Sequence, residues 1–303
     1  MKITKIALHQ NPHLDEIVAV MLFRRYGEDK FPGVSTAKLV AWGKKELAQT
    51  PPEMAAMSGT ILVGIGGGMF DDHGKSPRQD CAATLVAKHL GKMGNPVWGR
   101  ILRDVFLADS EASGSMQSLA EEVKNLNRYW AGSLDVERVY ALIEPMILAR
   151  LGRQDEYLTA SGRFESAYRN RIGGQIKLVA VDGLDNVQFQ HVARAAGVDI
   201  IVQRGSSGLT QILGSKDLDM VGLAVRLRKT EIAKSNLRMS HFMDDEELAA
   251  VGTIEEIPHW YLEGGFLLNG SESFPDVPPS NIKFADLVHL VEKHLIEFCR
   301  PKP

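Results

Sequence analysis

The sequence has 303 residues, of which 44% are hydrophobic and 24% charged, which is the composition of a globular protein with room for two hydrophobic cores. Its formal net charge of -3 gives no overall attraction to a nucleic-acid backbone. It has no apolar run of about 20 residues and no signal-peptide pattern, so we expect a cytoplasmic protein without a membrane partner. Cys81 and Cys299 lack metal-site spacing and predict neither a disulfide framework nor a zinc ribbon.

The first half of the chain predicts a domain with a parallel sheet over residues 1–152. An apolar run at 3–9 predicts a strand, and helical spacing at 14–25 predicts the next helix. Buried-type runs at 37–42 and 60–65 predict two more strands. Apolar periodicity then predicts a helical layer at 82–90, 101–107, 119–126 and 136–151.

A polar stretch at 153–172 predicts a linker to a smaller C-terminal α/β domain over residues 173–303. This domain begins with a predicted strand, helix and strand. The predicted elements of the whole domain lie at 176–181, 187–196, 198–202, 209–213, 219–234, 265–268 and 284–298. The predicted fold class is therefore α/β in both halves. The sequence leaves open whether the chain forms a homodimer.

Two histidines and a carboxylate lie between the first predicted strand and the first helix, in the run His9-Gln-Asn-Pro-His-Leu-Asp-Glu16. Loops that follow parallel strands meet at one edge of the sheet, where open α/β sheets bind their ligands. Imidazole and carboxylate ligands together favour Mn²⁺, Fe²⁺ or Zn²⁺ over Mg²⁺ or Ca²⁺. We therefore expect His9, His13 and Asp15 to bind metal, with Mn²⁺ as the first choice. A simple helix-capping role for Asp15 is the alternative.

A second polar cluster, Asp71-Asp72-His73, follows the predicted strand at 60–65 and the glycines Gly66-Gly67-Gly68. Glycine lets such a loop fold back over the sheet edge. Because both clusters follow parallel-type strands, we expect them to gather one or two ions at the same edge. Asp109, at the end of a predicted apolar helix, is a further candidate ligand. The alternative for the second cluster is a polar surface turn.

The order of these motifs resembles the DHH phosphoesterase superfamily. The matching features are a His-x3-His-x-Asp-Glu turn, a glycine-rich strand end, an Asp-x-His box and an alanine-rich helix that starts near Asp80-Cys-Ala-Ala-Thr. The resemblance covers roughly the first 110 residues and is greatest to the Myg-type branch of metal-dependent hydrolases and exonucleases.

This resemblance implies an N-terminal domain that binds Mn²⁺ and hydrolyses a phosphodiester with metal-activated water, and a C-terminal domain that holds the substrate. The substrate would be a phosphorylated small molecule, such as a nucleotide, or a short nucleic acid. His73 or Asp72 would assist proton transfer as the catalytic residue. By resemblance, the metal ligands are His9, His13, Asp15, Asp71, Asp72 and Asp109.

Two positions depart from the family pattern. The Asp that usually bridges two metals at the end of the third strand is Gly64 here, and the central His of the Asp-His-His box is Asp72. Three outcomes stay open: a single metal, a bridge moved to Asp71 or Asp72, or a protein that binds metal or ligand without catalysis. That non-catalytic protein is the main alternative function.

The C-terminal half contains candidate substrate-binding residues. Arg204, Ser206 and Ser207 lie in a glycine-containing loop whose guanidinium, hydroxyls and amides suit a phosphate. His259 precedes Trp260 and Tyr261, whose rings suit stacking on a base. The alternative for the loop is an ordinary hairpin turn. The alternative for the two aromatic residues is a position in the core. We also expect Arg226, Arg228 and Lys229 to form a solvated helix face.

The run Gly64-Ile-Gly-Gly-Gly68 after a predicted strand also suggests a dinucleotide-binding fingerprint. That fingerprint requires a helix to begin at its last glycine. Residues 69–74 predict a continuing loop instead. A Rossmann oxidoreductase is therefore the weakest of the three functional hypotheses.

Overall fold

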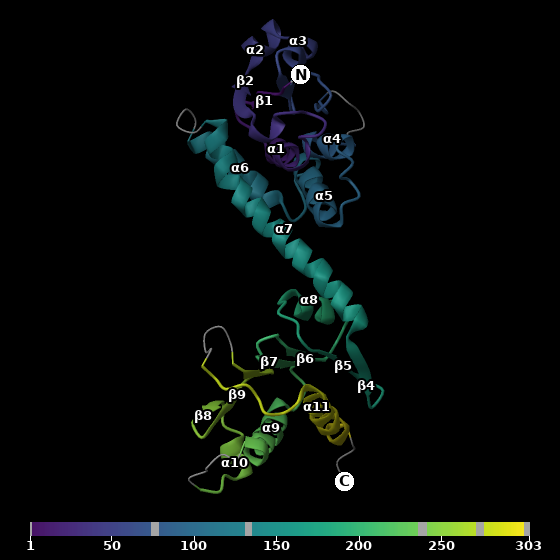
Figure 1. Cartoon of the computed structure of the whole chain (residues 1–303), viewed down its shortest axis with the longest axis vertical. Coiled ribbons are helices and arrows are strands. Elements are labelled where there is room, and N and C mark those ends of the chain that lie inside the picture. The colour runs from purple at the N-terminus through teal and green to yellow at the C-terminus, as the bar shows by residue number, and fades with distance from the viewer. Residues whose placement is uncertain (1, 74–78, 131–134, 236–240, 271–275, 300–303) are drawn as a thin grey trace. The chain divides into compact units, whose positions relative to one another are not determined.

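The computed structural model describes residues 2–73, 79–130, 135–235, 241–270 and 276–299. The chain divides into two compact units, Met1–Asp155 and Glu156–Pro303. Each unit combines its own sheet with helices (Figure 1). This arrangement confirms the predicted α/β class with two domains.

Unit 1 is built on a three-stranded parallel sheet in the order β2-β1-β3. Its strands are β1 (Lys5–His9), β2 (Lys38–Trp42) and β3 (Thr60–Leu62). His9 is the last residue of β1 and pairs in register with Trp42. Because the strands are parallel, the loops that follow them leave from the same edge of the sheet.

Helices cover both faces of this sheet (Figure 1). Ile6 and Leu8 of β1 point into the main core with α1, whereas Ala7 points to a smaller cluster with Leu47 and Ala55 of α2 and α3. The helices of unit 1 are α1 (Leu14–Tyr26), the 3-10 helix η1 (Val34–Thr36), α2 (Lys44–Gln49), α3 (Pro52–Met57), α4 (Ala82–His89), α5 (Pro96–Ser110), α6 (Gln117–Tyr129) and the first part of α7 (Val136–Ser166).

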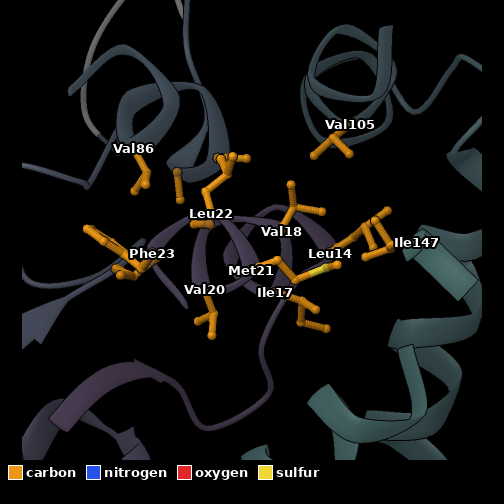
Figure 2. Packing of buried hydrophobic residues seen from close by; sticks show 14 of the residues in the cluster. Leu14, Ile17, Val18, Val20, Met21, Leu22, Phe23, Val86, Val105 and Ile147 are labelled. Carbon is orange, nitrogen blue, oxygen red and sulfur yellow. The ribbon is translucent and has the colours of Figure 1, made fainter. Parts of the chain in front are cut away.

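Helix α1 has no solvated face over most of its length. All residues from Leu14 to Phe23 are buried, and Figure 2 shows Val86 of α4, Val105 of α5 and Ile147 of α7 around it. A helix in such a position should be apolar all round. Asp15 and Glu16 are the exceptions, with exposed fractions of 4% and 1%. Buried carboxylates are rare unless they are paired, so these two mark a specialised site.

Unit 2 contains a seven-stranded sheet in the order β4-β5-β6-β7-β10-β9-β8. The pair β5–β6 is parallel, and the other neighbouring pairs are antiparallel. The elements are β4 (Tyr168–Ile172), β5 (Ile176–Val181), α8 (Gln188–Ala195), β6 (Ile200–Arg204), β7 (Thr210–Gly214), α9 (Met220–Ser235), α10 (Asp245–Leu248), β8 (Gly252–Ile254), β9 (Ile257–Glu263), β10 (Phe266–Asn269) and α11 (Phe284–Phe298).

The predicted solvated face of α9 is wrong at Arg228, which is fully buried. Its guanidinium donates to the carbonyls of Leu248, Ala250, Gly252 and Trp260. A buried cation is tolerated when its donors are satisfied in this way. Arg228 therefore ties α9 to β9 and to the segment that leads into β8. In the part of the chain that the structure describes, no helix is long and apolar enough to cross a membrane.

Residues 153–172, for which the sequence predicts a linker, form the end of α7 and strand β4. Gly173 and Gly174 follow with φ angles of 59° and 75° and form the turn into β5. Four of the five residues of β4 are exposed, because β4 is the first strand of the sheet. The sequence does not predict this strand, because an exposed edge strand lacks the apolar alternation of a buried one.

Replacing Leu22 by alanine tests the central position of α1. Leu22 is fully buried, and removing a buried leucine side chain costs about 2–5 kcal/mol. We expect the free energy of unfolding of unit 1 to fall by that amount, as measured from hydrogen exchange of the α1 amides in urea. Leu142→Ala, at a position of α7 that is 50% exposed, should change it by less than about 0.5 kcal/mol. Equal losses in both variants would contradict a central role for α1.

Candidate metal centre

The structure brings the two polar motifs together at one edge of the unit 1 sheet. His9 ends β1, His13 is the N-cap residue of α1, and His73 lies in the loop after β3. The ring centroid of His9 lies 5.8 Å from that of His13 and 5.7 Å from that of His73. Three imidazoles from two loops therefore face one small region.

Both motifs offer ligand atoms at metal-binding separations. One ligand atom from each of His13, Asp15 and Glu16 lies within 4.8 Å of the other two. The same holds for Asp71, Asp72 and His73. Imidazole nitrogens mixed with carboxylate oxygens are the donor set of transition ions such as Mn²⁺. The residues present therefore fit a divalent ion.

The carboxylate of Asp15 lies in a strongly acidic environment. Its Oδ2 accepts a hydrogen bond of 3.0 Å from the amide of Ala82, which starts α4. Burial raises the pKa of Asp15 well above its ordinary value, and the negative charges of Asp109, Glu16 and Asp72 raise it further. Asp109 of α5 is thus close enough to interact with Asp15. Like charges held this close together favour a cation between them.

A cavity of about 180 Å³ lies at this acidic cluster. The loop before α1, the box after β3 and helices α5 and α6 all contribute to its wall. Small side chains at Ala108 and Ala120 leave the space open. The polar residues that line it are His13, Asp15, His73, Asp109 and Lys124.

Glu16 is a site residue that is not among the metal ligands expected from the sequence. Its Oε1 accepts a hydrogen bond of 2.9 Å from the His9 amide, and its Oε2 accepts one of 2.8 Å from the His13 amide. Oε1 also lies 3.2 Å from His9 Nδ1, and this contact raises the pKa of His9. One buried carboxylate therefore fixes both ends of the loop that carries the two histidines. A capping-box pattern at His13 and Glu16 was the available sequence signal.

Gly64 has the backbone conformation and the surroundings that glycine requires. Its φ is +70°, and a Cβ added there would lie 2.8 Å from Glu16 Cγ and 3.1 Å from Glu16 Oε1. The side chain of Glu16 thus fills the space beside position 64, where the family resemblance places a bridging Asp. Glycine at this position and glutamate at position 16 are sterically complementary.

Asp71 braces the second motif. Its Oδ2 accepts a hydrogen bond of 2.7 Å from the Gly67 amide, and its Oδ1 accepts one of 3.0 Å from the His73 amide and lies 2.7 Å from His73 Nδ1. Burial alone would raise the pKa of Asp71, but these contacts outweigh it and leave the pKa below its ordinary value. The ring of His73 is held through Nδ1, which leaves Nε2 for either a metal ion or a proton. Asp72 is buried beside them, with an exposed fraction of 3%.

The loop from β3 to Asp71 does not contain the helix of a dinucleotide fingerprint. Residues 63–73 are all described, and none of them is helical. The amide of Gly64 donates to the carbonyl of Phe70 at 2.9 Å, and Val63 and Phe70 form a parallel bridge. The glycine-rich run therefore folds back on itself, which removes the structural basis for the Rossmann hypothesis.

In unit 2, much of the loop predicted to bind phosphate is engaged within the protein. Arg204 Nε donates to the Thr210 hydroxyl at 3.0 Å, and its Nη2 donates to the Ile282 carbonyl at 2.9 Å. The amide and the hydroxyl of Ser206 both donate to the carboxylate of Asp185. The amide of Leu209 donates to the Ser207 hydroxyl at 3.4 Å.

His259 lies in β9 with an exposed fraction of 4%, and its carbonyl accepts a hydrogen bond of 2.7 Å from Asn269 Nδ2. Trp260 beside it is fully buried in the unit 2 core. Its ring therefore packs in the core and does not present a surface on which a base could stack. Between described residues, no hydrogen bond or ion pair joins Arg204, Ser206, Ser207 and His259 to one another.

Comparisons with known proteins do not assign a family. No protein-family model and no curated protein matches the sequence. A solved DHH-domain structure, described as a member of the s1p family of ribosomal proteins, gives a TM-score of 0.30 and 10% identity over 98% of this chain and 87% of that chain. An uncharacterized protein from Helicobacter pylori G27 gives a TM-score of 0.26 and 8% identity, with 97% of this chain and 99% of that chain covered. Scores this low carry no argument, so function must be inferred from the site itself.

The bracing role of Glu16 predicts the effect of Glu16→Gln. The single side-chain oxygen of glutamine can accept a hydrogen bond from only one of the two backbone N–H groups. Its NH₂ group then faces the other backbone N–H, with which it cannot form a hydrogen bond. We expect Mn²⁺ affinity, measured by titration calorimetry, to fall about 10–100-fold, as for other residues that orient metal ligands. Glu46→Gln is a matched control because Glu46 makes the same kind of capping bond, to the Gly43 amide of α2. Equal effects of the two changes would refute the bracing role.

The fit between Gly64 and Glu16 predicts that Gly64→Ala weakens Mn²⁺ binding by displacing the Glu16 carboxylate. Gly91→Ala provides the control, because Gly91 has a similar φ of +67° but nothing within 4 Å of an added Cβ. Both variants carry the same backbone strain. The difference between them in Mn²⁺ affinity therefore reports the overlap with Glu16. We expect the Mn²⁺ affinities of the two variants to differ at least about tenfold. Equal affinities would show that the position of Glu16 does not depend on this space.

Proposed function

We propose that this chain is a metal-dependent hydrolase of the DHH phosphoesterase type, with Mn²⁺ as its metal and a phosphodiester in a nucleotide or short oligonucleotide as its substrate. The observation that carries this proposal is the convergence of Asp15 and Asp109, with His13 and His73, on one cavity of unit 1. Clustered carboxylates and imidazoles of this kind are the chemistry of metal-assisted hydrolysis.

The residues that would hold the ions come from both motifs and from α5. They are His9, His13, Asp15, Asp72 and Asp109, with His73 bordering the same cavity. When bound, the ions supply Lewis-acid activation of water and neutralise charge on the phosphoryl group. The protein's part is to hold these ligands in place, which Glu16 and Asp71 do through backbone amides.

His73 is the residue suited to proton transfer in this proposal. It lines the cavity, and its Nδ1 lies 2.7 Å from Asp71 Oδ1. A carboxylate at Nδ1 stabilises the imidazolium that forms when Nε2 accepts a proton. His73 would therefore take a proton at Nε2 from the attacking water, and Asp72 is the second candidate for this role.

Unit 2 would contribute to substrate binding. Arg204 Nη1 makes no hydrogen bond to any described residue, so it is the part of the guanidinium left for a phosphate oxygen. Ser206, Ser207 and His259 complete the proposed set. The amide and the hydroxyl of Ser206 would have to leave the Asp185 carboxylate if an anion bound there.

A metal-binding protein without catalysis is the second candidate. Gly64 favours it, because this position lacks the carboxylate that bridges two ions in the family pattern. Glu16 fills the space but already accepts two backbone hydrogen bonds. Binding of one ion without turnover is the outcome that this candidate predicts.

Asp15→Asn tests the proposal without disturbing the fold. Asparagine keeps an acceptor for the Ala82 amide and removes one of the charges that repel each other at the site. We expect the parent protein to hold one or two Mn²⁺ ions by elemental analysis and to hydrolyse bis(p-nitrophenyl) phosphate. The hydrolytic activity of the variant should fall by more than about 100-fold. Asp29→Asn, at an exposed position after α1, should have the activity of the parent. Metal without turnover in the parent would select the second candidate, and a parent that binds no Mn²⁺ would refute both.

A further inference from the structure

One lysine lines the cavity of the candidate metal centre. Of the described residues around this cavity, Lys124 is the only lysine or arginine, and it lies among Asp15, Asp109, His13 and His73. It comes from α6, which carries none of the sequence motifs discussed above. It therefore brings a positive charge to a wall that also contains two carboxylates.

Helix α6 is fixed against the site by its own packing. Leu119, Ala120 and Val123 are buried in the unit 1 core. Farther along the helix, Asn127 Nδ2 donates a hydrogen bond of 2.9 Å to the Pro12 carbonyl. Pro12 belongs to the loop that carries His9 and His13, so this bond joins α6 to the metal-binding loop.

The geometry of the helix directs Lys124 toward the cavity. Ala120, Lys124 and Asn127 are spaced by four and three residues and therefore lie along one face of α6. Side chains of a helix lean toward its N-terminus, so Lys124 leans over the turn that contains Ala120. Ala120 also lines the cavity, and its single methyl group leaves room for the ammonium group.

The ammonium group of Lys124 has no partner within the described structure. Lys88, Lys229 and Lys234 form ion pairs with Asp80, Asp245 and Asp286. Lys124 forms neither an ion pair nor a hydrogen bond with any residue that the structure describes. Ions bound by Asp15 and Asp109 would neutralise the two carboxylates that line the cavity. The three N–H donors of Lys124 would then be available to an anion in the cavity.

We propose that Lys124 is a substrate-binding residue that donates a hydrogen bond to an anionic phosphoryl oxygen held in this cavity. The inference rests on the proposed phosphoesterase function and adds to it the group that binds the phosphoryl oxygen on the side of α6. Lysine binds phosphate as a compact point charge. A cavity of about 180 Å³ takes a phosphoryl group, while the rest of the substrate lies outside it.

The test compares phosphate binding with metal binding in the full chain. Inorganic phosphate is titrated into Mn²⁺-saturated protein, and Mn²⁺ is titrated separately into phosphate-free protein, both by calorimetry. Lys124→Gln removes the charge, Lys124→Arg keeps it, and Arg128→Gln makes the same charge change at an exposed position of α6 that does not line the cavity.

Lys124→Gln should weaken phosphate binding roughly 10–100-fold, the equivalent of one charge-assisted hydrogen bond. Its Mn²⁺ affinity should equal or exceed that of the parent, Lys124→Arg should recover part of the loss, and Arg128→Gln should match the parent.

Four results would overturn the inference. Equal phosphate affinity in the parent and in Lys124→Gln would exclude Lys124 as the phosphoryl ligand. A parallel loss of Mn²⁺ affinity in Lys124→Gln would assign the effect to the metal ligands instead. Hydrolysis of bis(p-nitrophenyl) phosphate by the parent, with an unchanged KM in Lys124→Gln, would remove this inference and leave the proposed function intact. Absence of both hydrolysis and phosphate binding in the Mn²⁺-saturated parent would remove both.

Discussion

The two hydrogen bonds from backbone amides to the Glu16 carboxylate hold the site together. They join the end of β1 to the start of α1, so the loop from His9 to His13 is fixed at both ends. The same side chain fills the space beside Gly64, which places the end of the third strand against the first motif. Removing this carboxylate would release both histidines and open a gap beside Gly64. The separation of ligand atoms at this edge thus depends on one buried residue.

The surrounding structure compensates the unfavourable free energy of burying two carboxylates in α1. Asp15 and Glu16 lie in a helix that is otherwise apolar and enclosed on all sides, and buried charges are unfavourable unless they are compensated. Glu16 is compensated by two amides. Asp15 is compensated by the amide of Ala82 and by its raised pKa, which favours the neutral, protonated carboxyl group. A bound cation would remove the remaining repulsion. The local charge distribution therefore favours metal binding.

Unit 2 uses comparable polar groups to stabilise its own fold. Arg228 is buried and satisfied by carbonyls around α9, and Arg204 joins β6 to β7 and to the segment before α11. Burial lowers the pKa of both guanidinium groups. These examples show why a cationic residue near a glycine-containing loop or on a helix is ambiguous in sequence: the same side chain can serve a ligand or the protein backbone.

The sequence by itself determined the α/β class, the parallel strands and the two motifs, because apolar periodicity and the spacing of His and Asp are local properties of the chain. It could not determine β4, whose exposed edge position gives no apolar pattern, or the burial of Arg228. Only the tertiary structure decided the role of Glu16, the steric need for glycine at position 64 and the position of Lys124 in the wall of the same cavity as Asp109. Each of these depends on contacts between segments far apart in sequence or brought together by a turn. Residue type and spacing do not encode which partner a side chain meets across the fold.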